Sequence, residues 1–92
     1  MRMEDWIEGP VLRIIAGDTF EMQVTLAGAG NDYPYNPIEV IRLEQSAPPP
    51  DTEAGEEARR QLTDQLSGKI VRCYVKARAP EGHLYCEVIV RE

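Results

Sequence analysis

Cys73, Cys86 and His83 are the residues of this 92-residue sequence that could hold a soft metal ion. Thiolate sulfur and imidazole nitrogen are the ligands that zinc prefers, and a structural zinc site uses four of them. If Arg78 pairs near Glu81 in a hairpin, Cys73 falls opposite Cys86 on one face, among alternating apolar neighbours. The alternative, which we favour, is that both thiols are small buried hydrophobes and that His83 is a solvated surface residue. No disulfide is expected in a reducing compartment.

A second group of candidate residues lies in the loop at residues 31–37, where Tyr33 and Tyr35 stand among asparagine and proline. Exposed tyrosines can anchor a protein partner, because aromatic side chains are enriched among the residues that dominate binding energy. Alternatively, one or both rings cover the end of a barrel. Trp6 and Tyr85 could likewise stack single-stranded bases, although the arginines are scattered among acids rather than gathered in a groove.

The composition is that of one ordinary globular domain over residues 1–92. Apolar residues make up 42% and charged residues 28% of the sequence, which argues against disorder. The net charge of −6 disfavours general coating of nucleic acid, because binding to phosphates needs clustered Lys and Arg. The sequence has no run of 18 apolar residues that would predict a membrane span, and its first residues lack the apolar core of a secretory signal. We therefore expect a cytoplasmic protein with no membrane partner.

The elements that must position these residues are five short strands and one helix, predicted from apolar spacings of two and of four residues. Because the links between strands are short, we expect the strands to pair antiparallel. Five strands with a helix between the third and the fourth predict a mostly β fold, a closed OB-fold barrel with the order βββ-α-ββ. The expected strands are residues 11–15, 20–26, 38–43, 69–78 and 83–90, and the expected helix is residues 51–68.

The helix has start and stop signals of its own. Asp51 or Thr52 can serve as its N-cap, and Gly68 supplies the left-handed residue that ends many helices. Glu56 can pair with Arg60 one turn later. An apolar stripe recurs every four residues and should face the barrel: Ala54, Ala58, Leu62 and Leu66.

Four segments together resemble the staphylococcal (thermo)nuclease family. The stretch VLRIIAGDTF at residues 11–20 resembles that family's first hairpin, and residues 41–43 with the prolines after them are similar to its third strand and active-site loop. Residues 55–69 resemble its first helix and the strand after it, and residues 82–84 its last hairpin. The segments occur in the right order over roughly residues 10–90. The resemblance implies an OB-fold barrel and a calcium-dependent phosphodiesterase that cleaves DNA or RNA.

The resemblance also assigns roles to single positions. It implies a calcium ligand at Asp18 and a catalytic, phosphate-binding arginine at Arg42. The family's other calcium aspartate falls at Ala47, its catalytic glutamate at Pro50 and its second arginine at His83. Calcium takes six to eight oxygen ligands, so at most weak calcium binding is expected and no other cofactor. Since losing one preorganised donor costs about 3–4 kcal/mol of transition-state stabilisation, we expect no useful nuclease activity.

Both retained residues also have ordinary structural explanations. Asp18 can cap its own turn through its side chain, and Arg42 can pair with Asp18, Glu21 or Glu39. The resemblance implies two further helices after the fifth strand in the full enzyme, so we expect a truncated barrel in a sequence that ends at Glu92.

The leading prediction is a non-catalytic binding or interaction module that uses a protein partner, with Tyr33, Tyr35 and His83 as candidate binding residues. The first alternative is a calcium-dependent nuclease in which Glu44 or Glu53 replaces the lost carboxylate. The second alternative is a binder of single-stranded nucleic acid.

Overall fold

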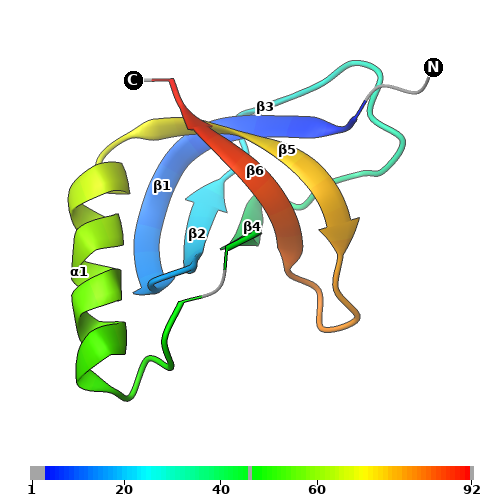
Figure 1. Cartoon of the computed structure of the whole chain (residues 1–92). Coiled ribbons are helices and arrows are strands. Elements are labelled where there is room, and N and C mark those ends of the chain that lie inside the picture. Colours follow the sequence, from blue (N-terminus) through cyan, green and yellow to red (C-terminus); the bar gives the residue numbers. More distant parts are fainter. Residues whose placement is uncertain (1–3, 46, 92) are drawn as a thin grey trace.

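The computed structural model describes residues 4–45 and 47–91, and it consists of a closed β-barrel with one helix along its side (Figure 1). Five strands close the barrel in the order β1-β2-β4-β6-β5, with β1 hydrogen-bonded to both β2 and β5. This arrangement confirms the OB-fold-like barrel. The elements are β1 (Trp6–Ala16), β2 (Thr19–Gln23), β3 (Leu26–Ala27), β4 (Ile38–Leu43), α1 (Glu53–Leu66), β5 (Ile70–Arg78) and β6 (Leu84–Val90).

The barrel is mixed rather than fully antiparallel. Strand β4 pairs parallel with β6, Ile41–Leu43 against Leu84–Cys86, so the expected antiparallel arrangement is wrong at this seam. A short link fixes the relative direction only of the two strands that it joins. Between β4 and β6 the chain passes through α1 and β5, so the pair can run parallel.

Strand β1 is longer than predicted, because the chain stays extended through Gly9 and Pro10 instead of beginning a strand after them. Pro10 pairs with Ile70 of β5, and β1 continues from there into its hairpin with β2. A Cβ at Gly9 would lie 1.8 Å from the carbonyl oxygen of Gln23. Glycine is therefore needed for close backbone approach at this bend, and it does not end the strand. The two-residue strand β3 pairs with Ile7 and Glu8, near the N-terminal end of β1.

Helix α1 begins as the sequence indicates. The Thr52 Oγ1 accepts a hydrogen bond from the backbone N–H of Gly55 at 3.0 Å, which makes Thr52 the N-cap. Gly68 has φ +75° and supplies the expected left-handed residue after the helix. Leu62 and Leu66 are buried, as predicted.

Two details of the helix prediction are wrong. Gly55 is buried in place of Ala54, because the chain before the helix crosses its first turn and a Cβ at residue 55 would lie 1.9 Å from the Pro49 oxygen. The ion pairs also join residues three apart rather than four. They are Glu56 with Arg59 and Glu57 with Arg60.

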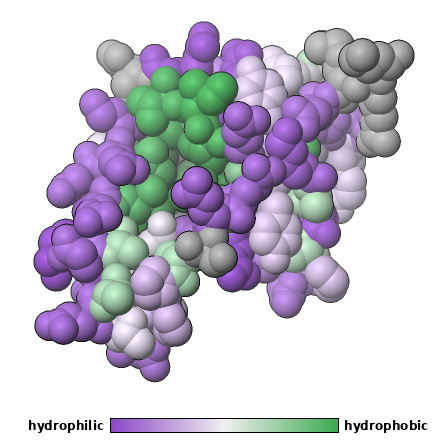
Figure 2. All heavy atoms as spheres, viewed as in Figure 1, coloured by the Kyte–Doolittle hydropathy of each residue, from purple (hydrophilic) through white to green (hydrophobic). Residues whose placement is uncertain are grey.

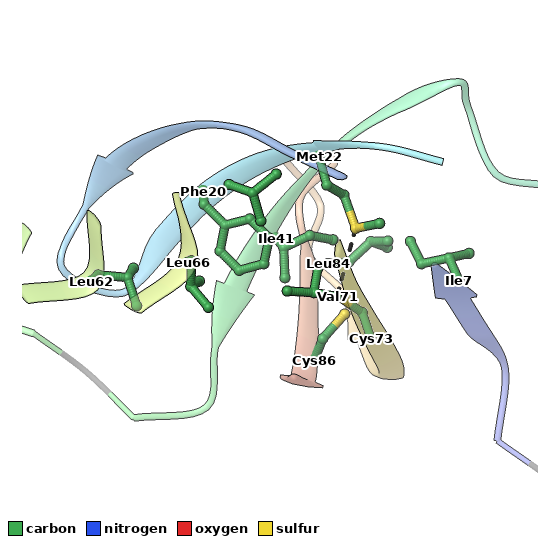
Figure 3. Close-up of a cluster of buried hydrophobic side chains, with 11 residues drawn as sticks. Ile7, Phe20, Met22, Ile41, Leu62, Leu66, Val71, Cys73, Leu84 and Cys86 are labelled. Carbon is green, nitrogen blue, oxygen red and sulfur yellow. Dashed lines mark hydrogen bonds between the residues drawn. The ribbon is translucent and has the colours of Figure 1, made fainter. Parts of the chain in front are cut away.

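The core fills the barrel and continues under the helix. Figure 3 shows Leu66 of α1 beside Phe20, and the two cysteines near each other, farther from the helix. The fully buried side chains come from all five barrel strands: Ile7, Phe20, Met22, Ile41, Val71, Cys73, Leu84 and Cys86. No helix in residues 4–45 and 47–91 is long and apolar enough to cross a lipid bilayer.

The cysteines share a face, but they are not opposite each other. Cys73 pairs with Val88 and Val75 pairs with Cys86, because the hairpin is longer than predicted and Arg78 pairs with Leu84. The predicted register is wrong by two residues. A shift of two keeps each side chain on its face, so both thiols remain in the core as expected.

Candidate functional site

Asp18 lies in the turn between β1 and β2 and is only 7% exposed. Its Oδ1 accepts a hydrogen bond from Thr19 Oγ1 at 2.9 Å, and its Oδ2 accepts one from the backbone N–H of Ala47 at 3.3 Å. Its backbone oxygen accepts a third bond from the N–H of Leu43 at 2.8 Å. Asp18 therefore ties the first turn to the segment that leaves β4.

Arg42 faces this turn from β4. Its Nε lies 3.6 Å from Oδ2 of Asp18, and its guanidinium carbon lies 5.8 Å from the ring centroid of Tyr85. Of the three acids expected as partners, the structure pairs Arg42 with Asp18. Glu21 instead lies 3.4 Å from Arg13. Because 41% of the Arg42 side chain is exposed, water screens the pair and its contribution to stability is at most about 1 kcal/mol.

The residues around Asp18 do not fit a calcium ion. Ala47 and Pro50 have no side-chain oxygen, and the positive guanidinium of Arg42 already faces the Asp18 carboxylate. In the described part of the chain, no group of three or more His, Cys, Asp or Glu side chains lies close enough to hold a metal ion. A site for calcium would need six to eight oxygen ligands.

His83 is half-buried at the start of β6 rather than fully solvated. Its ring meets the ring of Tyr85 edge-on, with 5.0 Å between the centroids. Its Nε2 is buried without a hydrogen-bond partner among the described residues. Because Tyr85 is also the neighbour of Arg42, the three side chains form a continuous surface, which we call the Tyr85 cluster (Arg42, His83 and Tyr85).

The two loop tyrosines have different environments. The Tyr35 hydroxyl donates a 2.7 Å hydrogen bond to Oδ2 of Asp5, and the ring packs against the core. Burial and this hydrogen bond raise the pKa of Tyr35 above its ordinary value. Tyr33 is 48% exposed, and its ring centroid lies 5.5 Å from that of Tyr35. Tyr35 therefore covers the barrel end, while Tyr33 presents its ring to the surface.

Arg78, at the end of β5, holds this aromatic pair in place. Its guanidinium carbon lies 4.3 Å from the ring centroid of Tyr33, and its Nη1 donates to the backbone oxygen of Gly82 at 3.1 Å. Its Nη2 lies 3.4 Å from Oε2 of Glu39, which is 3% exposed and also accepts from the N–H of Asn36 at 2.8 Å.

Sequence reasoning missed both Arg78 and Glu39 as site residues. A signal for Glu39 existed, because it lies two residues before the buried Ile41 and must share its face. No comparable signal marks Arg78, whose side-chain partners Glu39 and Tyr33 are 39 and 45 residues away along the chain.

A surface cavity of about 470 Å³ opens beside Tyr33. Acids and bases both line it, and Lys76 forms an ion pair with Glu4 that raises the pKa of Lys76. This ion pair leaves the cavity mixed in charge rather than basic. The lining residues are Glu4, Asp5, Asp32, Tyr33, Tyr35, Val75, Lys76, Ala77, Arg78 and Leu84.

The two thiols have the properties of core residues. Cys73 Sγ donates to Met22 Sδ at 3.6 Å. Hydrogen bonding to Cys73 and burial raise the pKa of Cys86 far above its ordinary value. Since the thiolate is the form that attacks or binds a metal, Cys86 is held in the form that does neither. The interpretation of both cysteines as small buried hydrophobes is confirmed.

Comparison of the sequence with models of known protein families, and with curated proteins, finds no match. The resemblance to the staphylococcal nuclease family therefore stays a prediction. The barrel topology by itself defines a fold, and one fold can carry many functions.

Proposed function

We propose that this protein is a non-catalytic binding module on a barrel similar to that of the staphylococcal nuclease family, and that it binds a protein partner in the cytoplasm. The observation that carries the proposal is the internal use of Asp18. Both of its carboxylate oxygens accept hydrogen bonds from the protein, and its charge faces Arg42. Of the groups that phosphodiester hydrolysis would need, the two that remain neutralise each other, and the side chains of Ala47 and Pro50 can neither bind a metal nor move a proton.

The cavity beside Tyr33 is the surface that we assign to the partner. Tyrosine and arginine are enriched among residues that dominate interfaces, and here Arg78 lies against an exposed tyrosine ring. The contacts of Tyr33 with Arg78 and Tyr35 hold its ring in one position, so binding costs little side-chain entropy. Carboxylates, an ammonium group and a guanidinium group line the cavity together, which suits a peptide of mixed charge better than a polyanion.

The catalytic part of the proposal is tested with single-stranded DNA and RNA, with calcium and with a chelator. We expect no cleavage in any mixture. Calcium-dependent cleavage that disappears in Arg42→Ala would overturn the proposal and favour the enzyme with a displaced carboxylate.

The binding part is tested by comparing three immobilised chains in extracts of the source cells. Tyr33→Ala removes the exposed ring, and Leu12→Ala is the matched control, because Leu12 is equally exposed and does not line the cavity. We expect a protein that binds the wild type and Leu12→Ala and is lost with Tyr33→Ala. If all three chains bound the same amount of the partner protein, the cavity beside Tyr33 would not be the binding site.

The Tyr85 cluster favours one second candidate, a binder of single-stranded nucleic acid. Bases stack on aromatic rings and guanidinium planes in such proteins, and Arg42 and His83 both contact Tyr85. Retention of an oligonucleotide at ~50 mM salt, lost in Tyr85→Ala, would support it. The net charge of −6 makes this function the weaker candidate.

A further inference from the structure

The outer edge of β6 lacks a strand partner along its second half, in the part of the chain that the structure describes. Strand β4 pairs only with Leu84–Cys86, and after Leu43 the chain turns away towards α1. Residues 87–90 are therefore paired with β5 alone. Backbone N–H and C=O groups point alternately to the two sides of a strand, so two of these four residues direct theirs outwards. An edge of this kind is a template for another strand.

An apolar groove lies beside this edge. It has a volume of about 420 Å³ between α1, β4 and β6. Figure 2 shows apolar side chains gathered on this face of the molecule. Val90 lies on the inward face of β6 with Cys86, yet it is 46% exposed because no strand continues β4 alongside it. The lining residues are Leu43, Leu62, Gln65, Leu66, Val88 and Val90.

The sequence of the edge is complementary to itself. Residues 87–91 read Glu-Val-Ile-Val-Arg. When two copies are laid antiparallel about Ile89, Glu87 of each copy falls opposite Arg91 of the other, and Val88 falls opposite Val90. Opposite charges and β-branched residues are both favourable cross-strand pairs. Any shift of this register separates the charges or places like charges opposite each other.

The charged residues of the edge are accessible for such pairing. The side chains of Glu87 and Arg91 are 60% and 52% exposed. Among the described residues, each has only a long ion contact within its own chain, 3.7 Å from Lys76 to Glu87 and 3.7 Å from Arg91 to Glu8. Charge complementarity therefore selects a second copy of this chain as the occupant.

We propose that two copies pair antiparallel through β6, about a two-fold axis at Ile89, and form one sheet that continues across both barrels. The interface is isologous, because the same edge serves both copies. The valines of the entering strand lie beside the groove, where they cover Val88 and Val90. A stable dimer buries roughly 1,200 Å² or more in total, and a five-residue edge supplies only part of that. Association is therefore weak and depends on protein concentration.

Sedimentation equilibrium over a wide range of concentration tests the dimer. We expect the apparent mass of the wild type to rise from that of the monomer towards twice that value. Glu87→Arg places arginines opposite each other and should raise the dissociation constant about tenfold or more. Glu81→Arg, in the exposed β5–β6 turn, makes the same charge change away from the edge and should leave the constant unchanged.

Exchanging the charges of Glu87 and Arg91 tests the register of the two β6 strands in the dimer. Arg91→Glu alone should weaken the dimer as Glu87→Arg does, and the double variant Glu87→Arg/Arg91→Glu should restore it to within about threefold of the wild type. A wild type that remains monomeric at all concentrations overturns the proposal. So does a double variant as weak as the single ones. None of these outcomes depends on the partner site at Tyr33.

Discussion

The Nε of Arg42 lies 3.6 Å from Oδ2 of Asp18, and the sheet fixes this distance because Thr19, the residue after Asp18, pairs directly with Arg42. In the resemblance to nucleases, these two residues are the retained metal ligand and the retained phosphate-binding group. In this barrel they face each other. The ion pair joins the first turn to β4, and it places opposite charges together without any ligand.

Asp18→Asn should destabilise the fold. The amide keeps one oxygen acceptor, but its NH₂ group faces either the Thr19 hydroxyl or the N–H of Ala47, and the charge opposite Arg42 is lost. We expect the free energy of unfolding to fall by about 1–3 kcal/mol. Urea denaturation measures the change. A variant as stable as the wild type would show that the turn does not depend on the carboxylate.

Ala47→Asp/Pro50→Glu should create a calcium response that the wild type lacks. If the resemblance aligns the loop correctly, the two new carboxylates join Asp18, and calcium then stabilises the folded state by binding to it. We expect the midpoint of thermal unfolding to rise by about 5 °C or more in millimolar calcium. The neutral variant Ala47→Asn/Pro50→Gln is the control. An equal response in both variants would leave the resemblance without support.

Arg78→Met should lower the free energy of unfolding, because Glu39 would stay buried without its cationic partner. The substitution removes the cation from a carboxylate that is 3% exposed. Breaking a buried ion pair costs several kcal/mol, and since Arg78 is a quarter exposed we expect roughly 2–3 kcal/mol. The double variant Glu39→Gln/Arg78→Met should recover part of the loss, as urea denaturation of all three chains will show. No recovery would mean that Arg78 acts through Tyr33 instead.

Local patterns in the sequence predict most of the strands and the helix. The direction and length of some strands depend instead on pairing between distant segments. Alternation of apolar residues placed most strand positions, and the Thr52 and Gly68 signals placed the helix ends. The direction of β4 against β6 follows from the closure of the barrel, which no local pattern encodes. The extension of β1 through Gly9 and Pro10 comes from pairing with β5, about 60 residues later in the sequence. The need for glycine at residue 9 comes from a carbonyl group 14 residues later, that of Gln23.

The same contrast between local and long-range signals applies to the residues of the candidate site. Asp18 and Arg42 are named through the family resemblance of two short segments, and their mutual pairing is among the expected contacts. No local signal brings Arg78, Glu39 and Tyr33 together. They come from the end of β5, from β4 and from the loop before β4. A buried glutamate next to Ile38 contradicts local hydropathy, since Ile38 is 52% exposed and Glu39 is not. The strand alternation fixed by Ile41 overrides the preference of each single residue.

The hydroxyl of Tyr35 should make stability depend on pH in the alkaline range. Its pKa is raised in the folded state by burial and by the hydrogen bond to Asp5. In the unfolded chain it titrates near its ordinary value of about 10. Unfolding above that pH therefore releases a proton. The stabilisation is complete below pH ~10 and is lost progressively as the pH rises above it.

Tyr35→Phe tests this linkage because it removes the titrating group and keeps the ring. We expect a loss of about 1 kcal/mol at pH 7, from the missing hydrogen bond to Asp5. Between pH 10 and pH 12, the variant should lose less stability than the wild type, so that the two urea midpoints converge. Tyr33→Phe changes a half-exposed ring of the same loop and should follow the wild type throughout. Parallel curves for wild type and Tyr35→Phe would refute the assignment of the alkaline dependence to this hydroxyl.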